Sequence, residues 1–83
     1  MKIEVRYFAS LREALGGAEA VEVGAGADVG ALRDALAARG GRHAEALGRQ
    51  RAVRSALNRV LCAESATLHE GDEVGFFPPV TGG

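Results

Sequence analysis

The residues with the clearest potential for chemistry are the last eight, Phe76-Phe77-Pro78-Pro79-Val80-Thr81-Gly82-Gly83. Proline fixes φ near about −65° and has no N–H group, so the double proline ends a strand and favours an extended segment. Glycine has no side chain, so the terminal carboxylate is sterically bare and fits a narrow channel. The pattern predicts an extended, flexible tail over residues 78–83 that presents its carboxylate to another protein, although a Gly-Gly end can also be a frayed terminus.

A carboxylate is a poor electrophile because its negative charge repels nucleophiles. Conversion to an acyl-adenylate makes it reactive, and that reaction uses ATP and magnesium. The chain lacks a glycine loop followed by Lys-Ser/Thr, which is the usual phosphate-binding signal. We therefore expect this chain to bind no cofactor, and we expect an activating enzyme to use ATP and Mg²⁺ in trans on Gly83.

The side chains offer no competing reactive cluster. Cys62 lies in a short apolar stretch and is interpreted as a small core residue, because burial raises a thiol pKa. His43 and His69 are far apart in sequence, and one cysteine cannot build a thiolate cluster, so no metal site is expected. The serines have no histidine and acid at suggestive spacing. The chain is expected to carry no catalytic constellation of its own.

Composition indicates one small folded domain. The chain has 83 residues, of which 47% are hydrophobic and 25% charged. A net charge of −1 argues against nucleic-acid binding, and no apolar run approaches the ~18 residues of a membrane span. No secretion signal is visible, and the single cysteine excludes an internal disulfide. These features predict a cytoplasmic protein.

Charge is unevenly distributed along the chain. One segment carries a single acid, Glu45, among six arginines: Arg39, Arg42, Arg49, Arg51, Arg54 and Arg59. A solvated basic surface is one interpretation, and a site for an anionic partner or a phosphate is the other. The sequence leaves both open.

Strict alternation predicts strands. In residues 2–8, Ile3, Val5 and Tyr7 point to one side, and the charged residues and Phe8 point to the other. Further strands are predicted over residues 20–23, 51–57, 60–62 and 73–77. Asn58 suits a tight turn between two of them, because asparagine tolerates positive φ.

Helical spacing predicts one main helix over residues 29–39, capped by Asp28. An apolar stripe runs through Val29, Leu32 and Leu36, and Arg33 is expected to point outward with Asp34. Two shorter helical segments are predicted over residues 10–15, capped by Ser10, and over residues 43–50, packed through Leu47.

One main helix across one face of a mixed sheet of about five strands is an α+β architecture. The division predicted is a folded domain over residues 1–77 and the tail over residues 78–83.

Three apolar residues fall on the outward side of their strands: Phe8, Leu61 and Phe77. Single exposed apolar residues need no explanation, but a cluster beside a functional tail predicts a partner docking patch. The alternative is that a loop covers them.

The run from Leu68 to Gly83, Leu-His-Glu-Gly-Asp-Glu-Val-Gly-Phe-Phe-Pro-Pro-Val-Thr-Gly-Gly, resembles the C-terminal signature of the small, sulfur-carrying subunit of molybdopterin synthase. The opening strand with Tyr7-Phe8-Ala9, the following Leu11-Arg12-Glu13 and Asn58 are also similar to that family. The resemblance covers essentially the whole chain and implies a ubiquitin-like β-grasp fold.

The resemblance also implies a mechanism. An activating enzyme would adenylate Gly83, and sulfur from a donor protein would replace the adenylate to give a thiocarboxylate. The tail, residues Pro78, Pro79, Val80, Thr81 and Gly82, would insert into the large subunit of a heterotetramer and donate sulfur to a cyclic pyranopterin precursor. The large subunit would supply the catalytic residues.

Three other functions remain open at this point. The chain could carry sulfur for another pathway, such as thiamine, cysteine or tRNA thiolation, although such carriers usually lack Phe-Phe-Pro-Pro before Gly-Gly. It could be a ubiquitin-like protein modifier, or an interaction domain with an inert tail.

Overall fold

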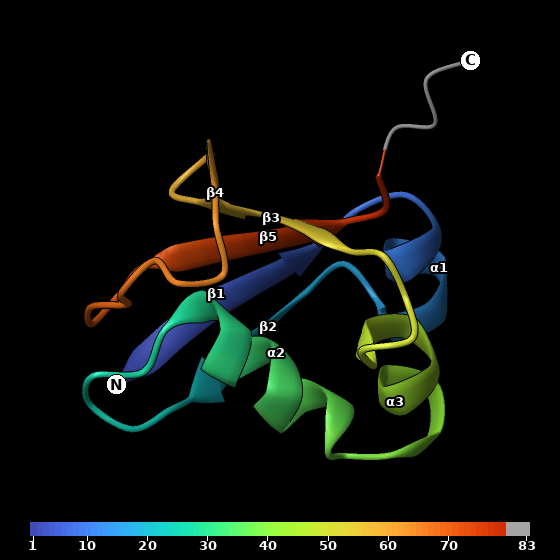
Figure 1. Ribbon diagram of the computed structural model, residues 1–83, viewed down its shortest axis with the longest axis horizontal. Helices are drawn as coiled ribbons and strands as arrows, with labels where there is room; N and C mark the ends of the chain where they lie inside the picture. The colour runs from blue at the N-terminus through green and yellow to red at the C-terminus, as the bar shows by residue number, and fades with distance from the viewer. Residues whose placement is uncertain (80–83) are drawn as a thin grey trace.

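The computed structural model describes residues 1–79 (Figure 1), so the predictions for Val80, Thr81, Gly82 and Gly83 lie outside the described residues. Its strands are β1 (Lys2–Tyr7), β2 (Ala18–Glu22), β3 (Arg54–Leu57), β4 (Val60–Cys62) and β5 (Glu73–Phe77). Its helices are α1 (Ser10–Leu15), α2 (Val29–Ala37) and α3 (Gly41–Leu47). None of the helices in the described part is long and apolar enough to cross a membrane.

The five strands form one mixed sheet in the order β2-β1-β5-β3-β4. The first and last strands are parallel neighbours at the centre, with Val5 opposite Val74 and Tyr7 opposite Phe76. The other strand pairs are antiparallel. Helices α2 and α3 lie on one side of the sheet, and the opposite face has no helix over it (Figure 1). This arrangement confirms the α+β prediction and the central pairing of a β-grasp sheet.

The alternating residues form the core, as predicted. Ile3, Val5 and Tyr7 of β1 are buried against the helix side, as are Val74 and Phe76 of β5. The apolar stripe of α2 is fully buried and covers them. Each such side chain contributes roughly 1.5–3 kcal/mol by leaving water. Burial of alternate positions on the two central strands therefore fixes which side of the sheet faces the helices and which stays open.

Helix α2 begins where the sequence predicts. The Asp28 side chain accepts a hydrogen bond from the Ala31 N–H at 2.8 Å, which satisfies one of the N–H groups left free at a helix start. The helix ends at Ala37, two residues before the predicted end at Arg39. Gly40 then turns the chain into α3 with φ of 76°, a conformation that glycine adopts without a steric cost.

The prediction that Ser10 caps α1 is wrong. Ser10 is the first helical residue, and no side chain caps the helix. The Phe8 carbonyl accepts the Leu11 N–H at 3.1 Å instead, while the Phe8 N–H donates to the Phe76 carbonyl at 3.1 Å. Helix α1 is thus anchored through the backbone to the end of the central strand pair, and a serine cap is not needed.

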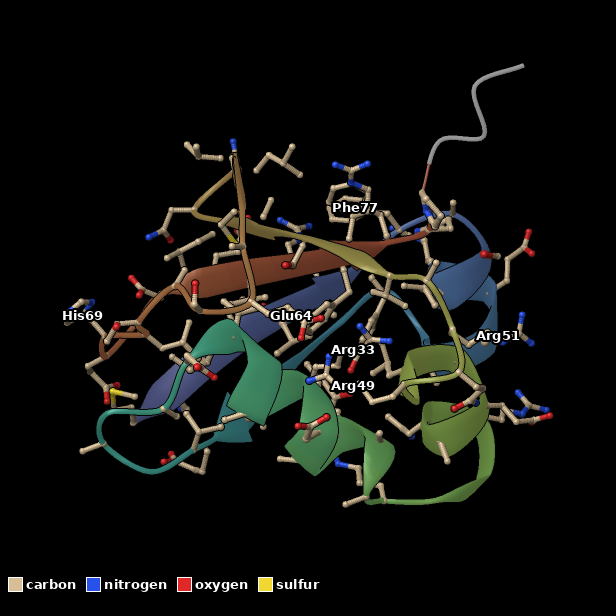
Figure 2. All side chains as sticks on the ribbon, viewed as in Figure 1. Arg33, Arg49, Arg51, Glu64, His69 and Phe77 are labelled. Atoms are coloured by element: carbon tan, nitrogen blue, oxygen red, sulfur yellow. The ribbon has the colours of Figure 1, made fainter. Side chains whose placement is uncertain are left out.

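The prediction that Arg33 points outward is also wrong, because the residue is only 4% exposed. The guanidinium donates to the carbonyl of Leu47 at 2.7 Å, of Gly48 at 2.9 Å and of Arg51 at 2.7 Å. It also pairs with Glu64 at 2.7 Å. The three carbonyls belong to the last residue of α3 and to the segment after it, so Arg33 ties α2 to the segment that leads into β3 (Figure 2).

Candidate functional site

The described part of the tail, Pro78 and Pro79, directly follows the central strand β5. The last pair of the β3–β5 ladder joins Arg54 to Phe77, and the prolines, which have no N–H group, cannot extend it. The chain leaves the sheet at the end where β1 runs into α1 (Figure 1). The predicted boundary of the strand at residue 77 is therefore confirmed. The roles predicted for Pro78, Pro79 and the four residues after them stay predictions.

The three predicted docking residues lie on the open face of the sheet. Phe8 is 45% exposed and Leu61 is 59% exposed, while Phe77 is half-buried. The side chain of Phe77 stands on the face opposite the helices (Figure 2). No loop in the described residues covers Phe8 or Leu61 completely. We call these three residues the open-face patch; its role in docking stays a prediction.

Phe8 is held against the strand that leads into the tail. A Cβ atom added to Gly75 would lie only 2.9 Å from Cε2 of Phe8, so the ring rests directly on the glycine. Gly75 faces the open side, as predicted, but it is buried because the Phe8 ring covers it. The glycine thus leaves room for an aromatic side chain against the strand that leads into the tail.

Charged residues flank the open-face patch. Glu73 on β5 lies between two arginines, at 3.8 Å from Arg6 and 3.7 Å from Arg59. Such exposed pairs contribute about 0–1 kcal/mol each to stability. An apolar centre with a polar edge is the composition of a protein–protein interface.

Replacing Phe77 with aspartate is expected to weaken binding to both partners that the resemblance implies, the activating enzyme and the large subunit. A central aromatic contact in an interface contributes about 2 kcal/mol or more, so affinity should fall roughly 30-fold or more. Titration calorimetry with each purified partner measures this, and thermal unfolding checks that the variant is folded. Val60→Asp is the matched control, because Val60 is 68% exposed but belongs to the other side of its strand. Unchanged affinity of Phe77→Asp for both partners would refute the docking role.

The acid pair Asp72-Glu73 is structural. Asp72 accepts hydrogen bonds from the Asn58 side chain at 3.0 Å and from the His69 N–H at 2.8 Å. These two bonds hold the pKa of Asp72 below its usual range. Asn58 and Arg59 have φ of 49° and 70°, which confirms the predicted tight turn. Asp72 and Asn58 together connect that turn to the start of β5.

Cys62 is half-buried and packs against the core, and its Sγ lies 3.8 Å from the Ser55 hydroxyl. This surrounding agrees with the interpretation of Cys62 as a core residue. Within residues 1–79, no three His, Cys, Asp or Glu side chains are grouped so that they could hold a metal ion.

Four of the six arginines in the arginine-rich segment form two groups of side chains. Arg39 pairs with Glu19 at 2.7 Å, and Arg49 binds both Asp34 at 2.9 Å and Glu64. The hydrogen bond from Arg49 holds the pKa of Asp34 below its usual range. All three acids lie outside residues 39–59, so these ion pairs could not be recognised from the sequence alone. Part of the basic segment therefore serves to join elements of the fold.

The other group borders a groove of about 400 Å³ between α1 and α3. Arg42 of α3 and Arg51, which follows α3, lie on it, and Pro78 forms part of its wall. Arg51 lies at the end of the molecule where the tail leaves the sheet (Figure 2). Sequence reasoning missed this groove, and the only signal for it was the arginine-rich segment. The tail thus starts between two surfaces, the open-face patch and this groove.

Comparison with known proteins gives consistent matches over the whole length of the chain. The ThiS family pattern matches residues 5–83. The molybdopterin synthase sulfur carrier subunit of Escherichia coli is 46% identical over 82 residues, which cover 98% of this chain and 99% of that protein. Two further relatives with the same name are 40% and 37% identical over nearly their full lengths.

Solved structures of related proteins also match the fold of this chain. SAMP1 from Haloferax volcanii matches with a TM-score of 0.79 at 29% identity, over 100% of both chains. A chain of the complex of subunits 1 and 2 of molybdopterin-converting factor from Helicobacter pylori matches with a TM-score of 0.70 at 28% identity, again over 100% of both chains. The ubiquitin-like β-grasp fold is therefore shown, and the chain belongs to the ThiS family, in which it groups with the sulfur carrier subunits of molybdopterin synthase.

Proposed function

We propose that this chain is the sulfur-donating subunit of a molybdopterin synthase and carries the sulfur as a thiocarboxylate on Gly83. The observation that carries the proposal is the match to three sulfur carrier subunits of that name, each over 98% or more of this chain. The structure adds support, because a compact sheet runs directly into the tail through Phe77 and Pro78.

The chemistry takes place in two steps at the terminal carboxyl group. First, a carboxylate oxygen of Gly83 attacks the α-phosphorus of ATP on the activating enzyme, and pyrophosphate leaves. Second, hydrosulfide delivered by a donor protein attacks the acyl-adenylate carbon, the bond to AMP breaks and AMP leaves, and the hydrosulfide proton is lost to solvent. The product is a thiocarboxylate with sulfur in place of one oxygen. No side chain of the carrier takes part, and no cofactor is bound by it in this scheme.

The partner that uses the sulfur is the large subunit. The Helicobacter pylori structure is a complex of two subunits of molybdopterin-converting factor, which supports a heteromeric assembly, here proposed as a heterotetramer. Residues 78–82 would enter the large subunit and bring the sulfur to a cyclic pyranopterin precursor. Two transfers would complete the dithiolene, and the catalytic residues would belong to the large subunit. The reducing cytoplasm is the compartment proposed.

Exchanging both Pro78 and Pro79 for glycine should slow sulfur transfer and leave the fold unchanged. Glycine gives the unbound tail more conformations, so more entropy is lost when the tail enters the partner. At about 0.4–1 kcal/mol per position, the rate at subsaturating large subunit should fall roughly 4- to 30-fold. Single-turnover assays at several partner concentrations measure this, and the deficit should shrink at saturation. An unchanged rate would show that stiffness of these two residues is irrelevant.

A reconstituted reaction tests the whole proposal. Carrier that has been loaded with sulfur by the activating enzyme is mixed with the large subunit and the pyranopterin precursor. Formation of the dithiolene, together with return of Gly83 to a carboxylate, is the expected result. Absence of product with the large subunit, but sulfur transfer to the acceptor of another pathway, would assign the carrier elsewhere.

A second candidate function is covalent modification of proteins. It is favoured by the likeness to the solved structure of Haloferax volcanii small archaeal modifier protein 1, with a TM-score of 0.76 at 28% identity. In that function a lysine amine would attack the activated Gly83 carbonyl and form an isopeptide bond. An immunoblot of cells expressing the tagged chain distinguishes the two. A ladder of conjugates that disappears without Gly83 indicates modification, whereas a single band indicates a carrier.

A further inference from the structure

The groove between α1 and α3 has an apolar floor, and its rim carries two arginines and one glutamate, Glu45. Leu11 and Ala14 of α1 and Val53, which precedes β3, contribute apolar surface. Arg42 and Arg51 are exposed residues on the same groove. The two arginines outnumber the glutamate, so the groove keeps a net positive charge and suits an occupant that has an apolar side chain close to a negative charge.

The two rim arginines differ from their neighbours in the segment. Arg39 and Arg49 are paired with acids, whereas neither Arg42 nor Arg51 forms an ion pair within residues 1–79. The Nε of Arg51 donates to the Glu45 carbonyl at 3.1 Å. This bond positions the guanidinium and leaves its terminal amino groups for another acceptor. The rim therefore offers charged donors at a fixed place.

The groove lies next to the first residue of the tail. Pro78 forms part of the groove wall and is also the first residue of the tail. A protein that takes up residues 78–83 must approach this wall closely. The groove and the open-face patch thus lie on either side of the place where such a protein has to bind.

We propose that this groove is a second docking site, which receives an extended segment of the large subunit that carries an apolar side chain followed by a carboxylate. The apolar side chain lies on Leu11, Ala14 and Val53, and the carboxylate pairs with Arg42 and Arg51. This inference rests on the proposed function, because it assigns the groove to the protein that uses the tail. Arginine forks bind carboxylates with defined geometry, so the contact also fixes the direction in which the tail is presented.

Charge reversal at the rim is the first test. Arg42→Glu should weaken binding of the full chain to the purified large subunit by roughly threefold to tenfold, mainly through slower association, and less at high salt. Lys2→Glu is the matched control, because Lys2 is exposed at the far end of β1 and makes the same change in charge. Surface plasmon resonance at two salt concentrations gives the rates. Equal effects of the two variants would overturn the groove as a docking site.

A second variant tests the apolar floor without relying on charge. Ala52 is exposed and borders the groove, so Ala52→Trp should obstruct it and leave the core intact. Weaker binding to the large subunit with an unchanged unfolding temperature supports the proposal. Unchanged binding contradicts it.

The outcomes also separate this inference from the proposed function. If Phe77→Asp weakens binding but Arg42→Glu and Ala52→Trp do not, the groove is not a docking site and the carrier function stands. If the unaltered chain does not bind the large subunit, both fail. If Arg42→Glu slows adenylation only, the groove serves the activating enzyme and the assignment to the large subunit is wrong.

Cross-linking identifies the occupant directly. A photoreactive phenylalanine analogue at position 52 is irradiated in the complex with the large subunit, and the product is digested and sequenced by mass spectrometry. The expected peptide comes from the large subunit and contains an apolar residue next to Asp or Glu. A cross-link to residues 80–83 of the carrier itself would show that the groove holds its own tail, and would overturn the proposal.

Discussion

Removal of Gly83 is expected to abolish sulfur transfer and to change the unfolding temperature by very little. The carboxyl group of the shortened chain belongs to Gly82, which stands one residue, or about 3.3–3.6 Å, short of the reacting position. A misplacement of only about 1 Å can cost a factor of ~100 in rate. In the described residues the buried core extends no further than Phe76, so stability has no reason to change.

Addition of one alanine after Gly83 gives the complementary control, because it keeps every native residue and places the carboxylate one residue beyond the reacting position. It should be as inactive as the deletion. Rates of sulfur transfer from variants incubated with the activating enzyme, and thermal unfolding followed by circular dichroism, provide the two readouts. A fully active chain without Gly83 would exclude this residue as the sulfur carrier.

Arg33→Ala is expected to destabilise the fold strongly. It leaves the carbonyls of Leu47, Gly48 and Arg51 without their buried donor and removes one partner of Glu64. Loss of a buried charged donor of this kind costs about 3 kcal/mol or more. A domain of this size gains only about 5–15 kcal/mol on folding, and 1 kcal/mol shifts Tm by about 4–8 °C, so Tm should fall by about 12 °C or more.

Arg39→Ala is the matched control for this prediction. Arg39 also pairs with a glutamate at 2.7 Å, but its side chain is 41% exposed, so its loss should cost about 0–1 kcal/mol. Urea unfolding of both variants gives the two free energies of unfolding. Similar losses for Arg33→Ala and Arg39→Ala would mean that burial of Arg33 does not stabilise the link between α2 and the segment after α3.

Local patterns predict much of this fold. Alternation in residues 2–8 correctly identifies which side chains of β1 are buried, because a strand exposes alternate residues to opposite faces. Spacing of Val29, Leu32 and Leu36 likewise identifies the buried side of α2. These signals depend only on the geometry of one element, so they can be recognised without the rest of the chain.

The burial of Arg33 could not be predicted in this way. Helical spacing places this charged residue next to the apolar stripe, and its burial is favourable because it donates to the carbonyls of residues 47, 48 and 51 and pairs with Glu64. The groove was missed for the same reason, since Ala14, Arg42 and Val53 meet only through the packing of α1 against α3. A contact or groove formed by segments that are distant in sequence cannot be recognised from the residue pattern of either segment alone.

Part of the candidate site depends on consecutive residues, and part on strand phase. The double proline and the two terminal glycines predict a presented carboxylate, and this stays a prediction because residues 80–83 lie outside the described residues. The open-face patch was predicted from strand phase, and the exposure of Phe8 and Leu61 confirms that assignment. Strand phase did not predict that the Phe8 ring rests on Gly75.

Intact-mass spectrometry tests the central claim most directly. The full chain is incubated with its activating enzyme, ATP, Mg²⁺ and a sulfur donor. Its intact mass is then measured, and the chain is fragmented to locate any change in mass. The account predicts a mass increase that corresponds to replacement of one oxygen by sulfur, located on Gly83 and absent when ATP is omitted. Sulfur found on Cys62 instead, or no sulfur on a chain that still supports synthesis of the dithiolene, would contradict it.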